Sequence, residues 1–561
     1  MKTKNDIKPF GATPSYRQLH HLKLGKKAFF HFGVNTFSGA EWGDGSENEK
    51  SFDPTDMNVR GWIRDIKAAG FRLAIITAKH HDGFCLWPSK YTEHSVKNSP
   101  YKDGNGDVIR EFTDACHEYG IEVGIYISPW DRHSPYWGTP EYSHYFANQL
   151  EEILTGYGRI DEIWWDGAGS LEAKYDWAHW ASLIRRHQPD AVIFGSMGAT
   201  PYVEMRWVGT EAGFAGKTHY ASIDAEMMFN ETVADLHRGV IGGELYIPAE
   251  VDVSIRPGWF YKKEQDDFVK SDRVIDDIWF RSVGNNAIML LNFPPNTTGN
   301  LHPTDVKNAI ESNRRIEHML AVNLINGAKI EAESTFSDDT KIDFALSDDD
   351  DCFYATAMDR DEAIINIRLP DGVDKFNTIM LGEKVELGER VTDFTLESLD
   401  GDTPEMLCSG TSIGYLRAVR FKGGAYKNLR LRLHGICAPI TLRTISLHYY
   451  PEDESDPIAC RKTANLASLP TAKITLSDKF NAQIMFGGIY PFDTVSFNMA
   501  LWGSYKIYAF DGSKYYTVAE GYCNDYRVKV KLDEPITSSY QIRIELDNQW
   551  GFGLDPDFKI Y

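Results

Sequence analysis

The sequence predicts an α/β protein in which a (β/α)8-like barrel is followed by two antiparallel β-sandwiches. Over the first 325 residues, short apolar runs alternate with amphipathic helical patterns, the rhythm of repeated βα units around a parallel sheet. After about residue 326 the pattern changes to short alternating segments spaced by Gly, Pro and Asp, which is typical of sandwiches. A chain of 561 residues also exceeds the size of one hydrophobic core. We therefore expect three domains, at residues 1–325, 326–452 and 453–561.

Apolar runs of strand length predict the barrel strands. Seven are clear, at 27–32, 71–77, 121–127, 160–165, 191–194, 205–208 and 286–291, and 242–247 would be the eighth. Helices are expected at 56–69, 108–119, 142–157, 173–187 and 271–283. Eight strands favour a closed barrel of the TIM type over an open doubly wound sheet, which has fewer strands and a switch point. No glycine-rich phosphate-binding motif follows any of these strands, so nothing supports nucleotide binding.

The C-terminal part predicts two sheet domains. Strands are expected at 363–369, 417–421, 428–433 and 442–449, and then at 494–498, 505–509, 526–532 and 541–546. The turn-rich acidic segment 451–457 lies between the two groups. The four aspartates at 348–351 lack the spacing of a calcium loop, so we interpret them as part of a solvated loop.

Composition excludes several classes of protein. No apolar stretch is long enough to cross a bilayer, and the formal net charge of −22 argues against nucleic acid or another polyanion as a partner. The seven cysteines are scattered without a C-x-x-C pair, which argues against a zinc ribbon or a disulfide framework. We expect most of them to be buried free thiols.

Two carboxylates occupy the most informative positions in the chain. Asp166 and Glu211 each follow a short apolar run beside tryptophan, and each lies close to a glycine where the run ends. At the exits of interior barrel strands, both would face one pocket, where paired carboxylates suit glycoside hydrolysis. The alternative is that both are ordinary strand-end acids that face water.

Other predicted strand ends are rich in polar and aromatic side chains. They are His31, His80, His81, Asp82, Tyr126, Trp130 and Asp131, and a later segment adds Glu250, Asp252, Arg256 and Trp259. Hydroxyl-binding groups combined with aromatic platforms are what sugars need. His80 and His81 are also candidate metal ligands. Neighbouring residues at a strand end point in different directions, however, and no H-E-x-x-H motif is present, so no metal and no cofactor are expected.

The combined motifs resemble glycoside hydrolase family 29, the α-L-fucosidases. The resemblance rests on segments that span almost the whole barrel, at 31–37, 41–45, 78–87, 128–133, 165–168, 206–211, 254–260 and 284–292. The run that contains Glu211 resembles the subfamily restricted to α-1,3/1,4-linked fucose. It departs from the family at Thr210 and Ala212, where Asn and Arg are common, in a region that bears on contacts with the sugar beyond fucose.

This resemblance implies a retaining, two-step mechanism in which Asp166 is the nucleophile and Glu211 is the acid/base. By position, it implies fucose-binding roles for His31, Glu41, Trp42, His80 and His81. Tyr126 would lie beside the nucleophile, Arg256 would approach the ring oxygen, and Trp130 would be a pocket wall. The sandwiches resemble the galactose-binding-like domains of such enzymes. Trp502, Tyr515, Tyr516 and Trp550 could form a sugar platform there, although packing roles are an alternative.

We therefore expect an exo-acting α-L-fucosidase that releases terminal fucose from branched oligosaccharides or glycoconjugates. A non-catalytic carbohydrate-binding protein on a hydrolase-like barrel is the alternative. A periplasmic or extracellular enzyme is expected, although residues 1–6 lack the apolar region of a signal peptide and a cytoplasmic location stays open. The sequence leaves the oligomeric state undetermined.

Overall fold

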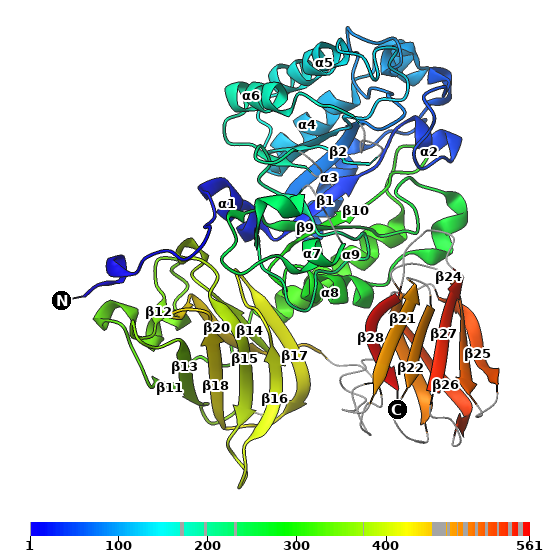
Figure 1. Cartoon of the computed structure of the whole chain (residues 1–561). Helices are drawn as coiled ribbons and strands as arrows, with labels where there is room; N and C mark the ends of the chain where they lie inside the picture. Colours follow the sequence, from blue (N-terminus) through cyan, green and yellow to red (C-terminus); the bar gives the residue numbers. More distant parts are fainter. Residues whose placement is uncertain are drawn as a thin grey trace.

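The computed structural model describes residues 2–168, 173–195, 199–228, 233–373 and 375–451. Beyond these it describes residue 467 and the segments 472–478, 481–485, 492–499, 503–510, 514–523, 527–536, 541–547 and 554–560. In Figure 1 the barrel lies above two sheet domains. None of the helices in these ranges is long and apolar enough to cross a membrane.

Eight parallel strands form the barrel sheet, in the order β5-β4-β3-β2-β1-β10-β9-β6. Their bounds are β1 Lys26–Phe30, β2 Leu73–Lys79, β3 Glu122–Ile127, β4 Glu162–Trp164, β5 Val192–Phe194, β6 Arg206–Trp207, β9 Ala249–Ser254 and β10 Ile288–Asn292. A parallel bridge between Phe194 and Met205 joins the end of β5 to the residue before β6. The sheet therefore closes almost completely, and the fold class expected from the sequence is confirmed.

Helices cover the outside of the barrel. They include α1 Tyr16–Leu24, α2 Val34–Ser38, α3 Val59–Ala68, α4 Val108–Tyr119, α5 Tyr142–Gly156, α6 Trp177–His187, α7 Val233–Arg238, α8 Asp272–Arg281 and α9 Pro303–Leu320. α3 and α6 begin three and four residues later than expected, because the side chains of Asn58 and Asp176 cap their first turns. Gly120, with φ of 67°, ends α4 where expected.

The eighth strand was predicted in the wrong place. Within 242–247 lies the short strand β8 Leu245–Tyr246, which pairs antiparallel with β7 Ser222–Ile223 outside the barrel sheet. The barrel strand is β9, which pairs with β10 and β6. Its alternation of Glu250, Asp252 and Ser254 with valines is strand-like, but the polar residues belong to a strand that is buried throughout.

A buried ion cluster holds the barrel interior together. Lys27 Nζ donates to Glu162 Oε2 at 2.7 Å and also contacts Glu250. Glu250 in turn accepts a hydrogen bond from the indole of Trp164 at 3.1 Å. All three side chains are fully buried, and burial, followed by the charge of Glu250, raises the pKa of Glu162 well above its ordinary value. The single positive charge of Lys27 therefore faces one carboxylate charge. The cluster also fixes the orientation of Trp164 from β4.

Each sheet domain is a sandwich of a five-stranded and a three-stranded antiparallel sheet. In the first, β11-β13-β18-β15-β16 faces β17-β14-β20, and in the second, β21-β22-β27-β24-β25 faces β26-β23-β28. The first comprises β11 Lys329–Ala332, β13 Glu362–Arg368, β14 Phe376–Gly382, β15 Val391–Ser398, β16 Glu405–Gly410, β17 Arg417–Gly424, β18 Asn428–Gly435 and β20 Thr444–His448. The second comprises β21 Lys473–Asp478, β22 Asn481–Met485, β23 Phe492–Met499, β24 Gly503–Phe510, β25 Tyr515–Cys523, β26 Arg527–Ile536, β27 Gln541–Asp547 and β28 Leu554–Ile560. Each sandwich has its own apolar core. The domain limits at 325 and 452 stay predictions.

The first sandwich is joined to the barrel by buried polar contacts. The carboxylate of Glu389 accepts hydrogen bonds from the amides of Ala221 and Ser222 and, at 2.6 Å, from the side chain of Asn286. Asn286 adopts φ of 59°, a left-handed conformation that Asn tolerates better than most residues. Its Oδ1 atom accepts from the amide of Tyr415 at 2.7 Å. The Gly284–Asn286 part of the motif therefore belongs to this joint.

Two minor expectations need correction. Of the five cysteines that the structure describes as free thiols, Cys85 and Cys116 are buried, whereas Cys352, Cys408 and Cys437 are partly exposed. Tyr515 and Tyr516 are consecutive on β25 and pair with Phe510 and Ala509, so their side chains point to opposite faces of the sheet. These two tyrosines do not form one sugar platform. Trp502 and Trp550 lie outside the described residues.

Candidate active site

A cavity of about 280 Å³ opens where the barrel strands end. Its apolar lining is aromatic and comes from different strands and loops: Phe29, Tyr126, Trp164, Phe194, Trp207 and Trp259. Its polar lining is His31, Glu41, His80, His81, Asp166, Glu211 and Asp252, and Trp42 lies at its edge. This volume is just below the range of about 300–1,000 Å³ typical of small-molecule sites, which suits one sugar ring.

Asp166 lies two residues after the end of β4 and is held by two hydrogen bonds. Its Oδ2 atom accepts a hydrogen bond from the hydroxyl of Tyr126 at 2.9 Å, and its Oδ1 atom accepts from the amide of Ala168 at 2.8 Å. The Nε2 atom of His81 lies 3.5 Å from Oδ2. Burial, followed by the charge of Asp166, raises the pKa of Tyr126 well above its ordinary value, so Tyr126 stays a donor. These two hydrogen bonds fix the orientation of the Asp166 carboxyl group.

Glu211 reaches the same cavity from the loop after β6. Its Oε2 atom accepts a hydrogen bond from the indole nitrogen of Trp259 at 3.0 Å. Burial raises the pKa of Glu211 to about 7, the Trp259 hydrogen bond opposes this shift, and the charges of Asp166 and Glu41 add to it. One carboxyl is therefore oriented by donors, while the other titrates near neutrality. Two carboxyl groups in such different environments can supply the acid and the base of one reaction.

The tautomer of His31 follows from its partner Asn292. The Nδ2 atom of Asn292 donates to the carbonyl oxygen of Trp259 at 2.9 Å, so its Oδ1 atom must be the acceptor for His31 Nδ1, which lies 2.9 Å away. Burial lowers the pKa of His31 to about 3, and the ring is neutral. The proton is on Nδ1, which leaves Nε2 as an acceptor for a hydroxyl group.

His81 is assigned in the same way. The Ser128 hydroxyl donates to the carbonyl of Trp130 at 2.7 Å, so His81 Nδ1 must donate to Ser128 Oγ across 2.8 Å. Burial lowers the pKa of His81. In the neutral ring, Nε2 is a bare acceptor that faces the Asp166 carboxylate, another acceptor. A ligand hydroxyl or amine that donates to these acceptors would relieve their repulsion. The cavity therefore favours a hydrogen-bond donor beside His81 and Asp166.

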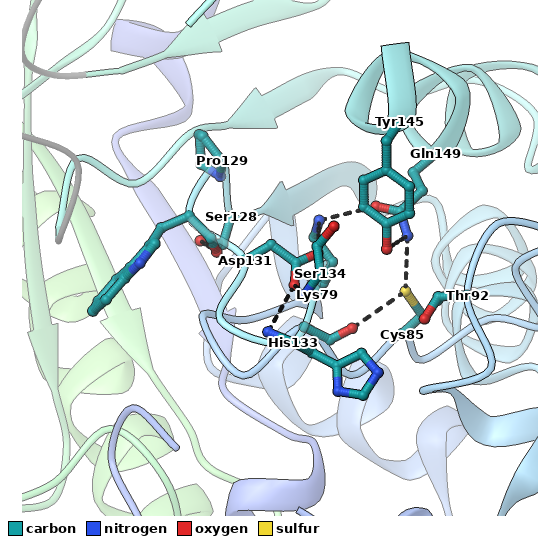
Figure 2. A network of polar contacts seen from close by, with 12 residues as sticks. Lys79, Cys85, Thr92, Ser128, Pro129, Asp131, His133, Ser134, Tyr145 and Gln149 are labelled. Carbon is teal, nitrogen blue, oxygen red and sulfur yellow. Dashed lines mark hydrogen bonds and ion pairs between the residues drawn. The ribbon is translucent and has the colours of Figure 1, made fainter. Parts of the chain in front are cut away.

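A buried network fixes the loop that carries Ser128. Lys79, the last residue of β2, donates to Asp131 Oδ2 at 3.0 Å and to Gln149 Oε1 at 2.9 Å. Asp131 Oδ1 accepts from the amides of His133 and Ser134. Figure 2 shows Lys79 between the loop and the helix that carries Gln149. The partner of His81 is therefore held from behind by interactions outside the cavity.

His80 and His81 lie closer together than the sequence argument assumed. Their rings are 4.2 Å apart, and His80 is stacked on Tyr126 at 5.6 Å. Donor atoms of His80, His81 and Asp166 all lie within 4.8 Å of one another. The two side chains do not point in different directions as expected, because both face the cavity.

Glu41 and Trp42 are brought to the site by the loop after α2. Glu41 accepts from the amide of Trp259 at 2.9 Å and pairs with Lys262 at 2.9 Å. Trp42 is 49% exposed, and its ring packs against His81 and Trp130. Trp130 also packs on His81 but does not line the cavity, so it supports the wall from behind.

The expectation for Arg256 needs correction. Its side chain is fully buried and does not line the cavity. The guanidinium makes a bidentate pair with Asp305, at 2.8 and 2.9 Å, and a third bond to Asp266 at 2.8 Å. Arg256 therefore anchors the loop that carries Trp259 to α9, and its donors face carboxylates of the protein instead of a ligand.

Sequence reasoning missed most of the cavity floor. Phe29, Trp164, Phe194 and Trp207 line the cavity without having been singled out. Phe29 and Trp164 each lie two positions before a recognised site residue, His31 and Asp166. Because side chains alternate along a strand, counting back by two from each strand end would have found them.

Comparison with known proteins gives a consistent result. The family model described as Alpha-L-fucosidase matches residues 25–312. Alpha-L-fucosidase 1 of Arabidopsis thaliana is 38% identical over 432 residues, which cover 74% of this chain and 82% of that protein. A glycoside hydrolase 29 family member from an unknown rumen bacterium is 30% identical, with a TM-score of 0.72, and the match covers 99% of this chain and 100% of that one. The Ruminococcus gnavus family 29 fucosidase, solved in complex with fucose, is 29% identical with a TM-score of 0.73 over 79% of this chain and 96% of that one.

Proposed function

We propose that this chain, which belongs to the α-L-fucosidase family, is a retaining exo-enzyme that releases terminal α-1,3/1,4-linked L-fucose from branched oligosaccharides or glycoconjugates. The chain is a glycoside hydrolase, and this sets aside the non-catalytic sugar-binding alternative.

One observation carries the mechanism. Asp166 and Glu211 line the same cavity in different environments, the first oriented by Tyr126 and Ala168 and the second with its pKa raised to about 7. In the first step, an oxygen of Asp166 attacks the anomeric carbon while Glu211 transfers its proton to the glycosidic oxygen, and the aglycone leaves as an alcohol. A retaining pair of this kind works at a carboxyl separation of about 5–5.5 Å.

The second step follows from the change in charge. Once Asp166 is esterified, its negative charge no longer raises the pKa of Glu211, so the Glu211 carboxylate is stable near neutrality. Glu211 then takes a proton from water, whose oxygen attacks the anomeric carbon and releases Asp166. Two displacements at one carbon retain its configuration.

The cavity also supports binding of one terminal sugar. His31 and His81 each present a bare nitrogen acceptor, Glu41 adds a carboxylate, and the aromatic floor offers faces for carbon–hydrogen bonds. A volume of about 280 Å³ suits one residue at a chain end. We assign fucose hydroxyl binding to His31, Glu41, His80 and His81. Trp42 lines the cavity at its edge, and Trp259 lines it beside Glu211.

Azide rescue tests the roles of the two carboxyls. Glu211→Ala should lose most activity on natural trisaccharides and much less on aryl fucosides with good leaving groups, and azide should restore turnover as a fucosyl azide of retained configuration. Asp166→Ala should be inactive on both substrates. Glu152→Ala is the matched control, because Glu152 also accepts from a tryptophan indole but lies outside the cavity. Normal turnover of a trisaccharide by Glu211→Ala would refute the acid/base assignment.

A panel of fucosylated oligosaccharides tests the linkage. Substrates with α-1,3 and α-1,4 bonds should be hydrolysed, and those with α-1,2 and α-1,6 bonds should be poor substrates. Equal rates on all four linkages would refute the proposed preference and leave the double displacement untouched.

A further inference from the structure

The strand β9 places three polar side chains inside the barrel, and only one of them lacks a complete set of partners. Glu250 is neutralised by Lys27 and accepts from Trp164. Ser254 donates to the carbonyl of Gly258 and accepts from Asn292. Asp252, between them, is 4% exposed, and its buried Oδ1 atom has no hydrogen-bond partner among the described residues. Its position therefore calls for a separate explanation.

The surroundings of Asp252 disfavour a negative charge. Asp252 lines the same cavity as Asp166 and Glu211, in a floor built mainly of aromatic rings, and no described lysine or arginine lines that cavity. The titratable groups that act on it are Glu211, Asp166 and Glu250, all acidic. Burial, followed by the charge of Glu211, raises the pKa of Asp252 well above its ordinary value. Ionisation here would add a negative charge to a small pocket that already holds the carboxyl groups of Asp166 and Glu211.

We propose that Asp252 is a positioning residue that stays protonated throughout the reaction and acts through Glu211. As a neutral carboxylic acid, it adds no negative charge that would raise the pKa of Glu211 further. Its O–H is also a donor within the cavity, available to the Glu211 carboxylate after that group has given its proton to the leaving oxygen. This inference rests on the proposed acid/base role of Glu211.

Asp252 would act on the protonation state of Glu211, which differs between the two half-reactions. In the first half-reaction Glu211 must hold a proton, and in the second it must be an anion. An ionised Asp252 would favour the protonated form of Glu211 in both halves and would slow hydrolysis of the fucosyl ester. A neutral Asp252 adds no such charge, and its hydrogen bond would stabilise the anion that the second half requires.

Three substitutions separate this role from packing. Asp252→Asn keeps the shape, the neutrality and a donor, so kcat should fall by no more than about threefold and the alkaline limb of the pH profile should stay in place. Asp252→Leu keeps volume without a donor, and Asp252→Ala removes both. In each, kcat on a natural trisaccharide should fall about tenfold or more. Thermal unfolding of every variant distinguishes loss of fold from loss of rate. An Asn variant as impaired as the Leu variant, with a normal melting temperature, would overturn the proposal.

A spectroscopic measurement tests the proton itself. In a Glu211→Gln background at pH 7, infrared difference spectra against Glu211→Gln/Asp252→Asn should contain the C=O stretch of a protonated carboxylic acid. A carboxylate band in its place would overturn the inference. This measurement does not depend on turnover, whereas the proposed function fails only if Asp166→Ala or Glu211→Ala variants stay active, so the two failures can be told apart.

Discussion

The hydroxyl of Tyr126 donates a hydrogen bond to Oδ2 of Asp166 across 2.9 Å, from a neighbouring strand of the same barrel. The two residues lie 40 positions apart in the sequence. Since burial and the Asp166 charge keep Tyr126 protonated, this bond holds the carboxylate in one orientation without neutralising it. The pair therefore links the geometry of adjacent strands to the reactivity of the proposed nucleophile.

Removing this hydrogen bond should slow the chemical step. Tyr126→Phe should lower kcat about tenfold to a hundredfold, because a hydrogen bond to a charged group contributes roughly 1.5–3 kcal/mol. Steady-state kinetics on an aryl fucoside measures the effect. Tyr157→Phe is the matched control, since the Tyr157 hydroxyl also donates to a carboxylate, that of Asp107, at 3.0 Å and away from the cavity. Equal loss in both variants would mean that the Tyr126 bond has no specific role.

The pH dependence of kcat/KM should depend on the hydrogen bond between Trp259 and Glu211. Glu211 must be protonated to act as the acid, and its pKa is about 7, so kcat/KM should fall as pH rises through about 7. The Trp259 bond lowers this pKa, so Trp259→Phe should move the alkaline limb to higher pH. Trp87→Phe, which breaks an indole bond to Glu152 outside the cavity, should leave the limb in place. A shift to lower pH in Trp259→Phe would contradict the assignment.

Metal ions should inhibit the enzyme without being required by it. Asp166 is already bonded by Tyr126 and Ala168, and the proposed steps use only protein carboxyls and water. Dialysis against a chelator should therefore leave kcat unchanged. His80, His81 and Asp166 can nevertheless converge on one ion, so added Zn²⁺ should inhibit competitively with the fucoside. Activity that is lost on chelation and restored by Zn²⁺ would support a metal-dependent hydrolase instead.

Arg256 should contribute mainly to stability. Arg256→Gln breaks a buried pair with Asp305 and should lower the free energy of unfolding by roughly 3–5 kcal/mol, measured by denaturant unfolding. Asp305→Asn removes the other partner, which does not line the cavity, and should produce a similar loss. If Arg256→Gln instead raised KM strongly at unchanged stability, the original expectation of contact with the ring oxygen would be favoured.

The joint between the barrel and the first sandwich should also depend on one side chain. Asn286→Ala should destabilise the protein by about 2–4 kcal/mol, because it removes a bond to the buried Glu389 and places a less tolerant residue at positive φ. Asn286→Gly restores the conformational freedom but not the bonds, so it should recover only part of the loss. Thermal unfolding measures both variants. Full recovery in the glycine variant would mean that the polar contacts contribute nothing.

Much of the barrel could be predicted because parallel strands are buried on both faces and read as apolar runs. Seven of the eight were placed by that signal, and α4 was placed at its observed bounds. β9 was missed because its inward positions carry Glu250, Asp252 and Ser254. Lys27 makes Glu250 acceptable in the interior, and that neighbour lies 223 residues away. A local pattern contains no information about such a partner.

Local sequence by itself determined the positions of strand ends, the end of α4 at Gly120, and the placing of Asp166 and Glu211 after strands, since these depend on neighbours a few residues away. Tertiary structure alone decided that Arg256 faces Asp305 and which nitrogen of His31 or His81 carries the proton. It also decided that Trp130 lies behind the cavity wall and that Asp252 lines the cavity. The reason is physical: the direction, ionisation and tautomer of a buried polar side chain follow from the groups that surround it in space, and closing a barrel brings those groups from distant parts of the chain.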